Sequence, residues 1–443
     1  MKNLIKFPLM VSAGLVAMTT IANAAVEVET AFVFNTLMFL IGGFLVMFMA
    51  AGFSMLEAGM VRSKNVATIC TKNIALYSIA GLMFWVVGYN LMYDIDAGGF
   101  MGSMGIWSSI GGDAGAEAGD FGDGTGYGAY SDWFFQMVFC ATAASIVSGT
   151  VAERIKLWPF LIFCAVLTGF IYPIVGSWEW GAGWLDAKGF SDFAGSTLVH
   201  SVGGWAALVG AIILGPRLGK YRTVNGQTVV TPIPGSNLPL ATLGTFILWF
   251  GWFGFNGGSQ LALGSGADAM AIGRIFTNTN MAAASGTVVA LILTQVLYKK
   301  VDLTMVLNGA LAGLVAITAE PLTPSIGQAV LIGGIGAALV VFAVPLLDKL
   351  KIDDVVGAVS VHLVAGIWGT IIVPFTNSDA TYGVQALGIV SIGAFVCIVS
   401  AIVWLVLKYT IGIRVTEEEE LAGLDVSELG LHAYPEFTHD AKI

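Results

Sequence analysis

Apolar segments about as long as a membrane-spanning helix alternate with short polar stretches along the chain. An α-helix needs about 20 apolar residues to cross the hydrocarbon core of a bilayer. Eleven segments meet this requirement, at about residues 31–54, 66–90, 131–151, 157–177, 196–215, 238–258, 277–297, 303–319, 327–347, 355–374 and 385–409. The pattern predicts an all-α integral membrane protein with eleven transmembrane helices.

Basic residues test this topology independently, because Lys and Arg concentrate in cytoplasmic loops. The loops predicted to lie outside contain only Lys188 and Arg274. The loops predicted to lie inside, with the start of the tail, hold Arg62, Lys64, Arg154, Lys156, Arg217, Lys220, Arg222, Lys299, Lys300, Lys349, Lys351, Lys408 and Arg414. The alternation predicts an N-terminus outside and a C-terminus in the cytoplasm.

Composition agrees with a membrane protein. Charged residues make up 11% of the chain, hydrophobic residues 56%, and the mean hydropathy is +0.84. Soluble domains carry roughly 25% charged residues, so lipid must cover most of this surface. The net charge is −10, and no basic footprint of the kind that binds nucleic acid is present. The four cysteines lie singly in apolar segments, which indicates buried hydrophobes rather than a disulfide framework or a metal site.

The N-terminus has the features of a secretory signal peptide. Lys2 and Lys6 precede an apolar run, and Ala22-Asn23-Ala24 forms an A-x-A cleavage pattern. We therefore expect a signal peptide at residues 1–24 and a location in a bacterial inner membrane; a short first anchor helix is the alternative. A transmembrane domain at 25–410 and a cytoplasmic tail at 411–443 follow.

Two segments, 192–205 and 354–368, repeat each other. In both, a Gly follows an Asp by three residues, a His follows it by eight, and a Val precedes the His. The copies lie in the fifth and tenth predicted spans, so they enter the membrane from opposite sides. This predicts two five-helix inverted repeats, at about 31–215 and 238–374, followed by a terminal helix. Transporters of this kind bind substrate near the midplane, where the repeats meet.

The two repeated histidines, His200 and His362, are the only ones within the apolar spans. A lone buried His is usually structural, but a pair at equivalent repeat positions predicts a shared pore. Two neutral imidazoles can share one N–H···N contact while their other nitrogens face a polar guest. Zinc is the competing interpretation, but no carboxylate or thiolate completes a ligand set. We expect no metal and no cofactor.

Aromatic residues gather near the predicted outer mouth. Trp180 precedes the fifth span, Phe135 and Phe139 share one face of the third, and residues 252–259 end the sixth. Most membrane aromatics form an interfacial belt. A small cation leaving water, however, is stabilised by ring faces together with oxygen acceptors, and Trp180, a Phe and Ser259 offer this combination.

The long outer loop, residues 94–130, contains six acidic residues and neither Lys nor Arg. One interpretation is an attractive field for cations at the entrance. The other is an ordinary solvated loop whose charges are screened by salt. The sequence leaves both open.

The segment Asp192–His200 closely resembles the signature of the ammonium transporter (Amt/Mep/Rh) family. The likeness extends to Leu56–Asn65, Ala152–Arg154, Gly251–Ser259 and Gly412–Val415, and it covers about residues 30 to 437. The resemblance, to the bacterial Amt type, implies transport of ammonium or ammonia, no enzymatic activity, and a homotrimer with one pore per subunit. It also suggests a P-II signal protein as a partner at the cytoplasmic face.

The resemblance assigns a role to each candidate residue by motif. The outer ammonium site would contain Phe139, Trp180, Ser259 and Asp192, the pore gate Phe139 and Phe255, and the pore lining the twin histidines His200 and His362. The chain departs from the family at Gly357, where an acidic or polar residue is common, and at Leu363, where Gly often stands.

These features together predict that ammonium is captured at the outer site and deprotonated, and that ammonia then passes the gate and the histidines. An apolar pore excludes hydrated ions because their desolvation finds no replacement ligands. The alternatives are an ammonium sensor or transceptor of the same architecture, and a channel for another small neutral solute.

Overall fold

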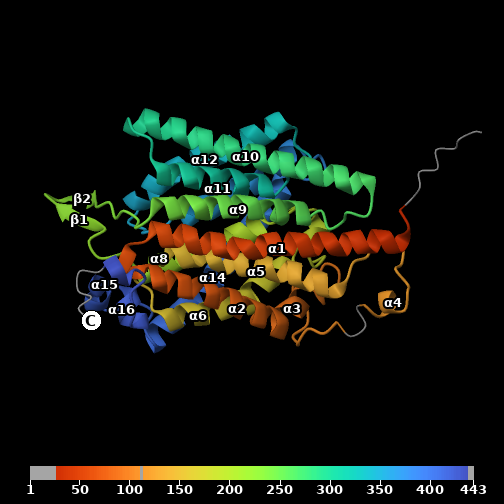
Figure 1. Cartoon of the computed structure of the whole chain (residues 1–443), viewed down its shortest axis with the longest axis horizontal. Coiled ribbons are helices and arrows are strands. Elements are labelled where there is room, and N and C mark those ends of the chain that lie inside the picture. Colours follow the sequence, from red (N-terminus) through yellow and green to blue (C-terminus); the bar gives the residue numbers. More distant parts are fainter. Residues whose placement is uncertain (1–25, 110–112, 438–443) are drawn as a thin grey trace, which may run out of the picture.

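The computed structural model describes residues 26–109 and 113–437, so the predicted signal peptide lies outside the described residues. Within them the chain forms a bundle of long helices that run in nearly the same direction (Figure 1). The α-helices are α1 Val28–Met60, α2 Val66–Met83, α3 Tyr89–Tyr93, α4 Ala114–Glu117, α5 Ala129–Thr150, α6 Leu157–Val166, α7 Tyr172–Ser177, α8 Val202–Leu214, α9 Leu238–Gly258, α10 Gly266–Tyr298, α11 Leu303–Thr318, α12 Ile326–Lys349, α13 Ala365–Ile371, α14 Tyr382–Thr410, α15 Glu417–Ala422 and α16 Leu424–Leu429.

Short turns of other helix types complete the secondary structure. Wider π-helical turns occupy Phe84–Gly88, Leu167–Ile171, Ser196–Ser201 and Val359–Val364, and tighter 3₁₀ turns occupy Ser63–Asn65, Asp186–Lys188, Val373–Phe375 and Pro435–Phe437. The first two π turns join α2 to α3 and α6 to α7, so each pair forms one continuous span.

Among the described residues, nine helical segments are long and apolar enough to cross a membrane. They are Val28–Met60, Ser63–Tyr93, Ala129–Thr150, Leu157–Ser177, Ser196–Leu214, Leu238–Gly258, Gly266–Tyr298, Ile326–Lys349 and Tyr382–Thr410. The other two predicted spans correspond to shorter apolar helices, Leu303–Thr318 and Val359–Phe375. The predicted class of multi-span helical membrane protein is confirmed, and the count of eleven spans stays a prediction.

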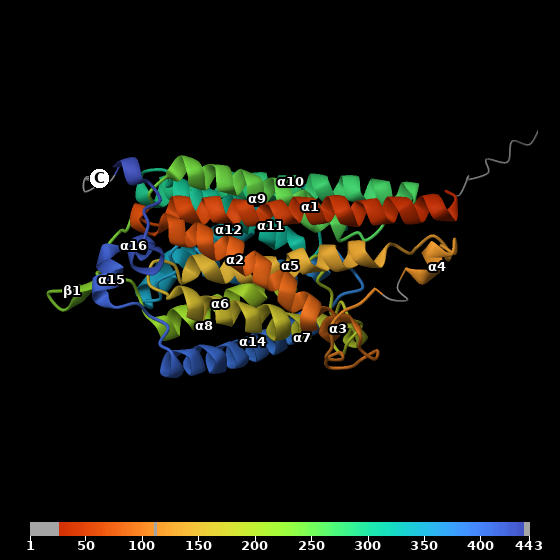
Figure 2. The ribbon, with the colours of Figure 1, turned by 60° about the horizontal axis from the view of Figure 1, so that its bottom comes forward.

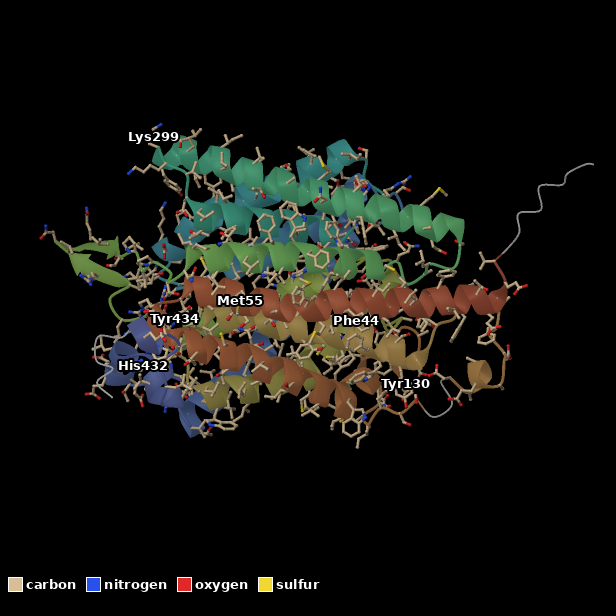
Figure 3. The ribbon with its side chains drawn as sticks, in the orientation of Figure 1. Phe44, Met55, Tyr130, Lys299, His432 and Tyr434 are labelled. Atoms are coloured by element: carbon tan, nitrogen blue, oxygen red, sulfur yellow. The ribbon has the colours of Figure 1, made fainter. Side chains whose placement is uncertain are left out.

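The two ends of the bundle differ in character. Helices α15 and α16 lie at one end, which we call the tail end, and α4 lies toward the other, which we call the loop end (Figures 1 and 2). Lys299, His432 and Tyr434 lie toward the tail end, whereas Tyr130 lies in the opposite half (Figure 3). The histidine of the tail that the structure describes is thus far from the bundle interior.

Basic residues from separate predicted inner loops meet at the tail end. Arg62 pairs with Glu153 at 2.5 Å, and Arg217 pairs with Asp353 at 2.8 Å. Burial raises the pKa of Asp353, but the hydrogen bonds from Arg217 and the charges of Arg154 and Arg217 outweigh it and hold that pKa well below its usual range. These loops therefore share one end of the bundle, as the alternating topology requires.

The C-terminal tail folds back onto this end. The carbonyl oxygen of Ile413 accepts the N–H of Lys156 at 2.9 Å. The carboxylate of Asp425 accepts the N–H of Thr68 at 2.7 Å, at the start of α2. Because these N–H groups belong to the first residues of two spans, the tail satisfies donors that a helix cannot satisfy itself.

A small hairpin was not expected in an all-α chain. Strands β1 (Tyr221–Val224) and β2 (Gln227–Val230) pair antiparallel between α8 and α9. Asn225 and Gly226 both adopt positive φ, at 51° and 79°, which is the geometry of a two-residue hairpin turn. The Asn-Gly pair between alternating residues is the signal in the sequence that indicates this hairpin.

Close helix packing rests on small residues. A Cβ added at Gly244 of α9 would lie 2.3 Å from the backbone N of Leu56 and 2.7 Å from the carbonyl oxygen of Gly52, both on α1. Glycine at this crossing brings the two backbones into contact, as in other membrane bundles.

The two histidine segments have the same local construction. Asp192 accepts the backbone N–H groups of Thr197 and Leu198, five and six residues later, at 2.7 and 2.8 Å. Asp354 accepts those of Val359 and Ser360, again five and six residues later, at 2.9 and 3.2 Å. Each carboxylate therefore supplies acceptors at the start of a π-helical turn that carries a His.

The two segments cross in opposite directions. The hydroxyl oxygens of Thr197, near the start of the first segment, and Thr370, near the end of the second, are 2.7 Å apart. Gly204, four residues after His200, packs against Leu363. A Cβ added at Gly204 would lie 2.7 Å from the Cβ of Leu363. This antiparallel crossing brings the two histidines face to face.

We expect Gly313→Ala to destabilise the bundle. The added Cβ would lie 2.2 Å from the carbonyl oxygen of Ala282 on α10, and overpacking of this kind costs about 1–3 kcal/mol. The apparent Tm of the detergent-solubilised protein should fall by several degrees. Gly327→Ala is the control, because that Cβ meets no atom within 4 Å; equal Tm values for both variants would contradict the packing argument.

We expect Asp192→Ala to be more harmful. The side chain also accepts the N–H groups of Gly195 and Ser196, so the variant strands four buried donors, each of which costs about 1–3 kcal/mol when unsatisfied. The measurement is the apparent Tm in detergent, with Asp186→Ala as the control because Asp186 is an exposed carboxylate in the same loop. A loss no greater than that of the control would refute the capping role.

Candidate functional site

A cavity of about 380 Å³ opens between the loop-end segments of the bundle. Its walls are mostly aromatic, with a few polar side chains, and they comprise Tyr89, Tyr93, Tyr127, Asp132, Phe135, Gln136, Phe139, Trp180, Phe193, Ser259 and Leu261. Three of the residues predicted for the outer ammonium site, Phe139, Trp180 and Ser259, therefore line one vestibule although they come from three different segments.

The geometry of these three residues suits a small cation. The rings of Phe139 and Trp180 are 6.1 Å apart and nearly perpendicular, at 80°. The hydroxyl of Ser259 donates to the carbonyl oxygen of Phe255 at 2.9 Å, which turns the lone pairs of its oxygen away from that bond. An N–H donor with positive charge finds ring faces and an oxygen acceptor here.

Asp192 occupies a different place from the other predicted site residues. It is completely buried, it does not line the vestibule, and its carboxylate is taken up by four backbone N–H groups. Its own carbonyl oxygen accepts the indole N–H of Trp180 at 3.2 Å. Asp192 thus orients Trp180 and the following turn and does not itself face the vestibule.

Glu179 supports Asp192 in turn. One oxygen of its carboxylate accepts the backbone N–H of Asp192 at 2.7 Å. Burial, together with the neighbouring charge of Asp192, raises the pKa of Glu179 well above its ordinary value. Glu179 does not line the vestibule, so its contact with the site runs through the backbone of Asp192.

Part of the vestibule wall, around Asp132, was not predicted from the sequence. Asp132 receives hydrogen bonds from the hydroxyl of Tyr89 and from Gln136, the latter at 3.2 Å. A signal was available: Asp132, Phe135 and Phe139 are spaced by three and four residues, so they share one face of α5. The tyrosines Tyr89 and Tyr93 come from a distant segment, and no local pattern links them to that face.

Two phenylalanines close the vestibule at its deep end. The rings of Phe139 and Phe255 are stacked, with centroids 4.0 Å apart and planes inclined by 23°. Both side chains are buried. The predicted pair therefore forms a closed apolar plug in this structure.

The twin histidines follow directly behind the plug. His200 stacks on Phe255 at 5.2 Å and on Trp252 at 4.9 Å. Its Nδ1 lies 3.2 Å from Nδ1 of His362. A nitrogen can accept a hydrogen bond only when it is unprotonated, so this contact requires at least one neutral imidazole. Among the described residues, Nε2 of His200 has no hydrogen-bond partner, which leaves it available to a polar guest.

Two further cavities continue toward the tail end. A small one of about 10 Å³, which is room for a single water-sized guest, is lined by His362 and by apolar residues such as Phe53 and Ile146. A larger one of about 130 Å³ reaches the tail end. Asn308, Val356 and Gly357 line both cavities, so the two adjoin. Vestibule, plug, histidines and inner cavities thus form one series across the bundle.

The two departures from the family pattern have structural partners. Gly357 has a φ of 83°, a conformation that glycine adopts readily, and a Cβ there would lie 2.3 Å from the side-chain nitrogen of Asn308. Leu363 fills the space beside Gly204. Within the described residues, His, Cys, Asp and Glu form no group of three or more that could hold a metal ion.

Comparisons with known proteins agree with one another. A family model described as Ammonium Transporter Family matches residues 37–434. Ammonium transporter Amt2 of Archaeoglobus fulgidus is 42% identical over 430 residues, which covers 90% of this chain and 87% of the relative. A putative ammonium transporter of Synechocystis is 40% identical over 91% of this chain and 89% of the relative.

Solved structures give the same picture. A structure named Sensor Amt Protein matches with a TM-score of 0.81 and 38% identity, over 90% of this chain and 99% of the other. Mep2 from Candida albicans matches with a TM-score of 0.75 and 26% identity, over 92% of each chain. Because the family model matches most of the chain and an ammonium transporter is 42% identical over 90% of it, the chain belongs to the ammonium transporter family.

Proposed function

We propose that this protein carries ammonium across the inner membrane by capturing the cation, removing its proton and passing ammonia through a dry pore. The observation that carries the proposal is the series of an aromatic vestibule, a stacked phenylalanine plug and a histidine pair sharing one hydrogen bond. Relatives named as ammonium transporters support the substrate.

Capture takes place in the vestibule. Ammonium is held by the ring faces of Phe139 and Trp180 and by the hydroxyl oxygen of Ser259, while Asp192 fixes Trp180 in place. Potassium has a similar size and charge, but it has no N–H to donate and no proton to lose. The protein therefore distinguishes ammonium from potassium beyond the vestibule, because only a guest that can lose a proton becomes neutral and passes further.

Passage follows after deprotonation. Opening of the Phe139–Phe255 stack admits neutral ammonia, whose N–H groups and lone pair are met by the free nitrogens of His200 and His362. A hydrated metal ion gains no such replacement for its water shell, so the apolar walls exclude it.

Orientation and assembly complete the proposal. The tail end, where Arg62, Arg217 and the tail meet, faces the cytoplasm, and the vestibule faces outward. Residues 1–24 are the signal peptide that directs the chain to this membrane. The family resemblance supports a homotrimer with one pore per subunit. The transmembrane domain is residues 25–410, built as two inverted repeats, and the antiparallel crossing of the two His segments supports that division.

The histidine pair is tested by substituting both residues. We expect His200→Ala combined with His362→Ala to abolish concentrative uptake of radiolabelled methylammonium into proteoliposomes, because the guest loses the imidazole nitrogens that replace its contacts with water. His432→Ala, in the exposed tail, is the control. Uptake and selectivity equal to those of the unaltered protein would remove the pair from the mechanism.

A sensor or transceptor of the same architecture is the second candidate, and the Sensor Amt Protein structure favours keeping it. A sensor would bind methylammonium without net uptake, so equilibrium binding together with zero flux would support it. The same flux assay, with water or carbon dioxide as the permeant, tests the neutral-solute alternative.

The family link also supports a P-II signal protein as partner of the tail end. We expect a trimeric P-II protein to be retained by the full chain and lost after removal of residues 411–443, because the tail covers the starts of α2 and α6. A pull-down measures this. Equal retention by both forms would place any P-II contact elsewhere.

A further inference from the structure

Glu57 of α1 is a buried acid that the proposed transport path does not use. Its side chain is 1% exposed, and it lies three residues before the end of α1, on the face that packs inward. A carboxylate in such a place is costly unless its oxygens are satisfied, and it usually marks a function. Its surroundings therefore decide what it does.

One oxygen of Glu57 is fully engaged. Oε2 accepts the hydroxyl of Ser148 at 2.7 Å and the side-chain N–H of Asn73 at 3.2 Å. A basic residue is also near: Lys72 donates to the carbonyl oxygen of the same Ser148 at 2.8 Å, and its Nζ lies 4.4 Å from the ring centre of Phe160. Ser148 and Asn73 thus hold the carboxylate in one orientation, and Lys72 lies nearby, bonded to the backbone of Ser148.

The other oxygen has no such partner. Among the described residues, Oε1 of Glu57 makes no hydrogen bond although it is buried. Glu57 lines the small cavity of about 10 Å³ that His362 also lines. Since Nδ1 of His362 faces His200, Nε2 is the nitrogen that His362 has left for a guest. A single water there can bridge an imidazole N–H and a carboxylate oxygen.

From this arrangement we propose that Glu57 accepts the proton that the histidine pair carries inward, through one water in the shared cavity. The inference rests on the proposed function, which leaves the fate of that proton open. The Nε2–H bond of His362 breaks as an O–H bond of the water forms. Another O–H bond of that water breaks as Oε1–H of Glu57 forms.

The other proton transfers accompany this one, so neither imidazole passes through an anionic form. Nδ1–H of His362 forms as Nδ1–H of His200 breaks, and Nε2–H of His200 forms as an N–H bond of the ammonium held in the vestibule breaks when the Phe139–Phe255 stack opens, which leaves ammonia to pass. Oε1–H of Glu57 then breaks as an O–H bond forms on a water of the small cavity, and the proton passes on to water in the 130 Å³ inner cavity, which shares Asn308, Val356 and Gly357 with the small one. Ammonia and proton thus cross by adjoining routes, and transport moves one positive charge.

Glu57→Gln tests the proposal, because the amide keeps an acceptor for Ser148 and Asn73 but takes up no proton. The measurement is made on proteoliposomes, with methylammonium-driven current and radiolabelled methylammonium uptake recorded on the same preparation. We expect the ratio of current to uptake to fall at least about tenfold and Glu57→Asp to restore most of it. Glu320→Gln is the matched control, since Glu320 is also a buried acid but lines none of the pore cavities.

Each result has a distinct meaning. An unchanged ratio in Glu57→Gln overturns the proposal, and so does a parallel loss of current and uptake in both Glu57 variants, which indicates a purely structural role. Uptake without current in the unaltered protein overturns the proton route but leaves the proposed function intact. Neither uptake nor current in the unaltered protein overturns the proposed function itself.

Discussion

The contact between Nδ1 of His200 and Nδ1 of His362 is the constraint around which the bundle is arranged. It requires two rings from segments far apart in sequence to lie almost parallel, at 21°, and in the membrane interior. At that depth neither ring can exchange this contact for a hydrogen bond to bulk water, and an unpaired buried nitrogen is costly. Phe53 lies beside His362, and Trp252 and Phe255 stack on His200, so aromatic rings flank both members of the polar pair.

The backbone that carries the rings is held from both sides. Each His lies on a π-helical turn that begins beside an Asp, which is buried for Asp192 and half-buried for Asp354, and π turns are often found at functional sites. The carboxylates replace hydrogen bonds that the widened helix start cannot make for itself. Since the two segments run antiparallel, each carboxylate lies toward an opposite end of the bundle, and the rings meet between them.

Much of this was predictable from the sequence. Apolar length and loop charge identified the helical membrane class, and the spacing of Asp, Gly and His identified the two equivalent segments. The Phe139–Phe255 plug and the vestibule residues followed from the family motif. What could not be predicted depends on distant contacts: Tyr89 and Tyr93 beside Asp132, the position of Asp192 behind Trp180, and Glu57 beside His362. No periodicity within one helix shows which neighbour a side chain meets. The hairpin at Asn225-Gly226, by contrast, could have been predicted from its turn residues.

The contact of Gly204 with Leu363 couples the two halves of the chain. A Cβ at position 204 would lie 2.7 Å from the Cβ of Leu363 and 2.8 Å from its backbone N, so the two backbones come too close there for any side chain at position 204. Exchange of the second half for that of a relative with glycine at position 363 would instead leave a void beside Gly204. Chimeras between members of this family therefore have to be cut so that both positions come from the same parent.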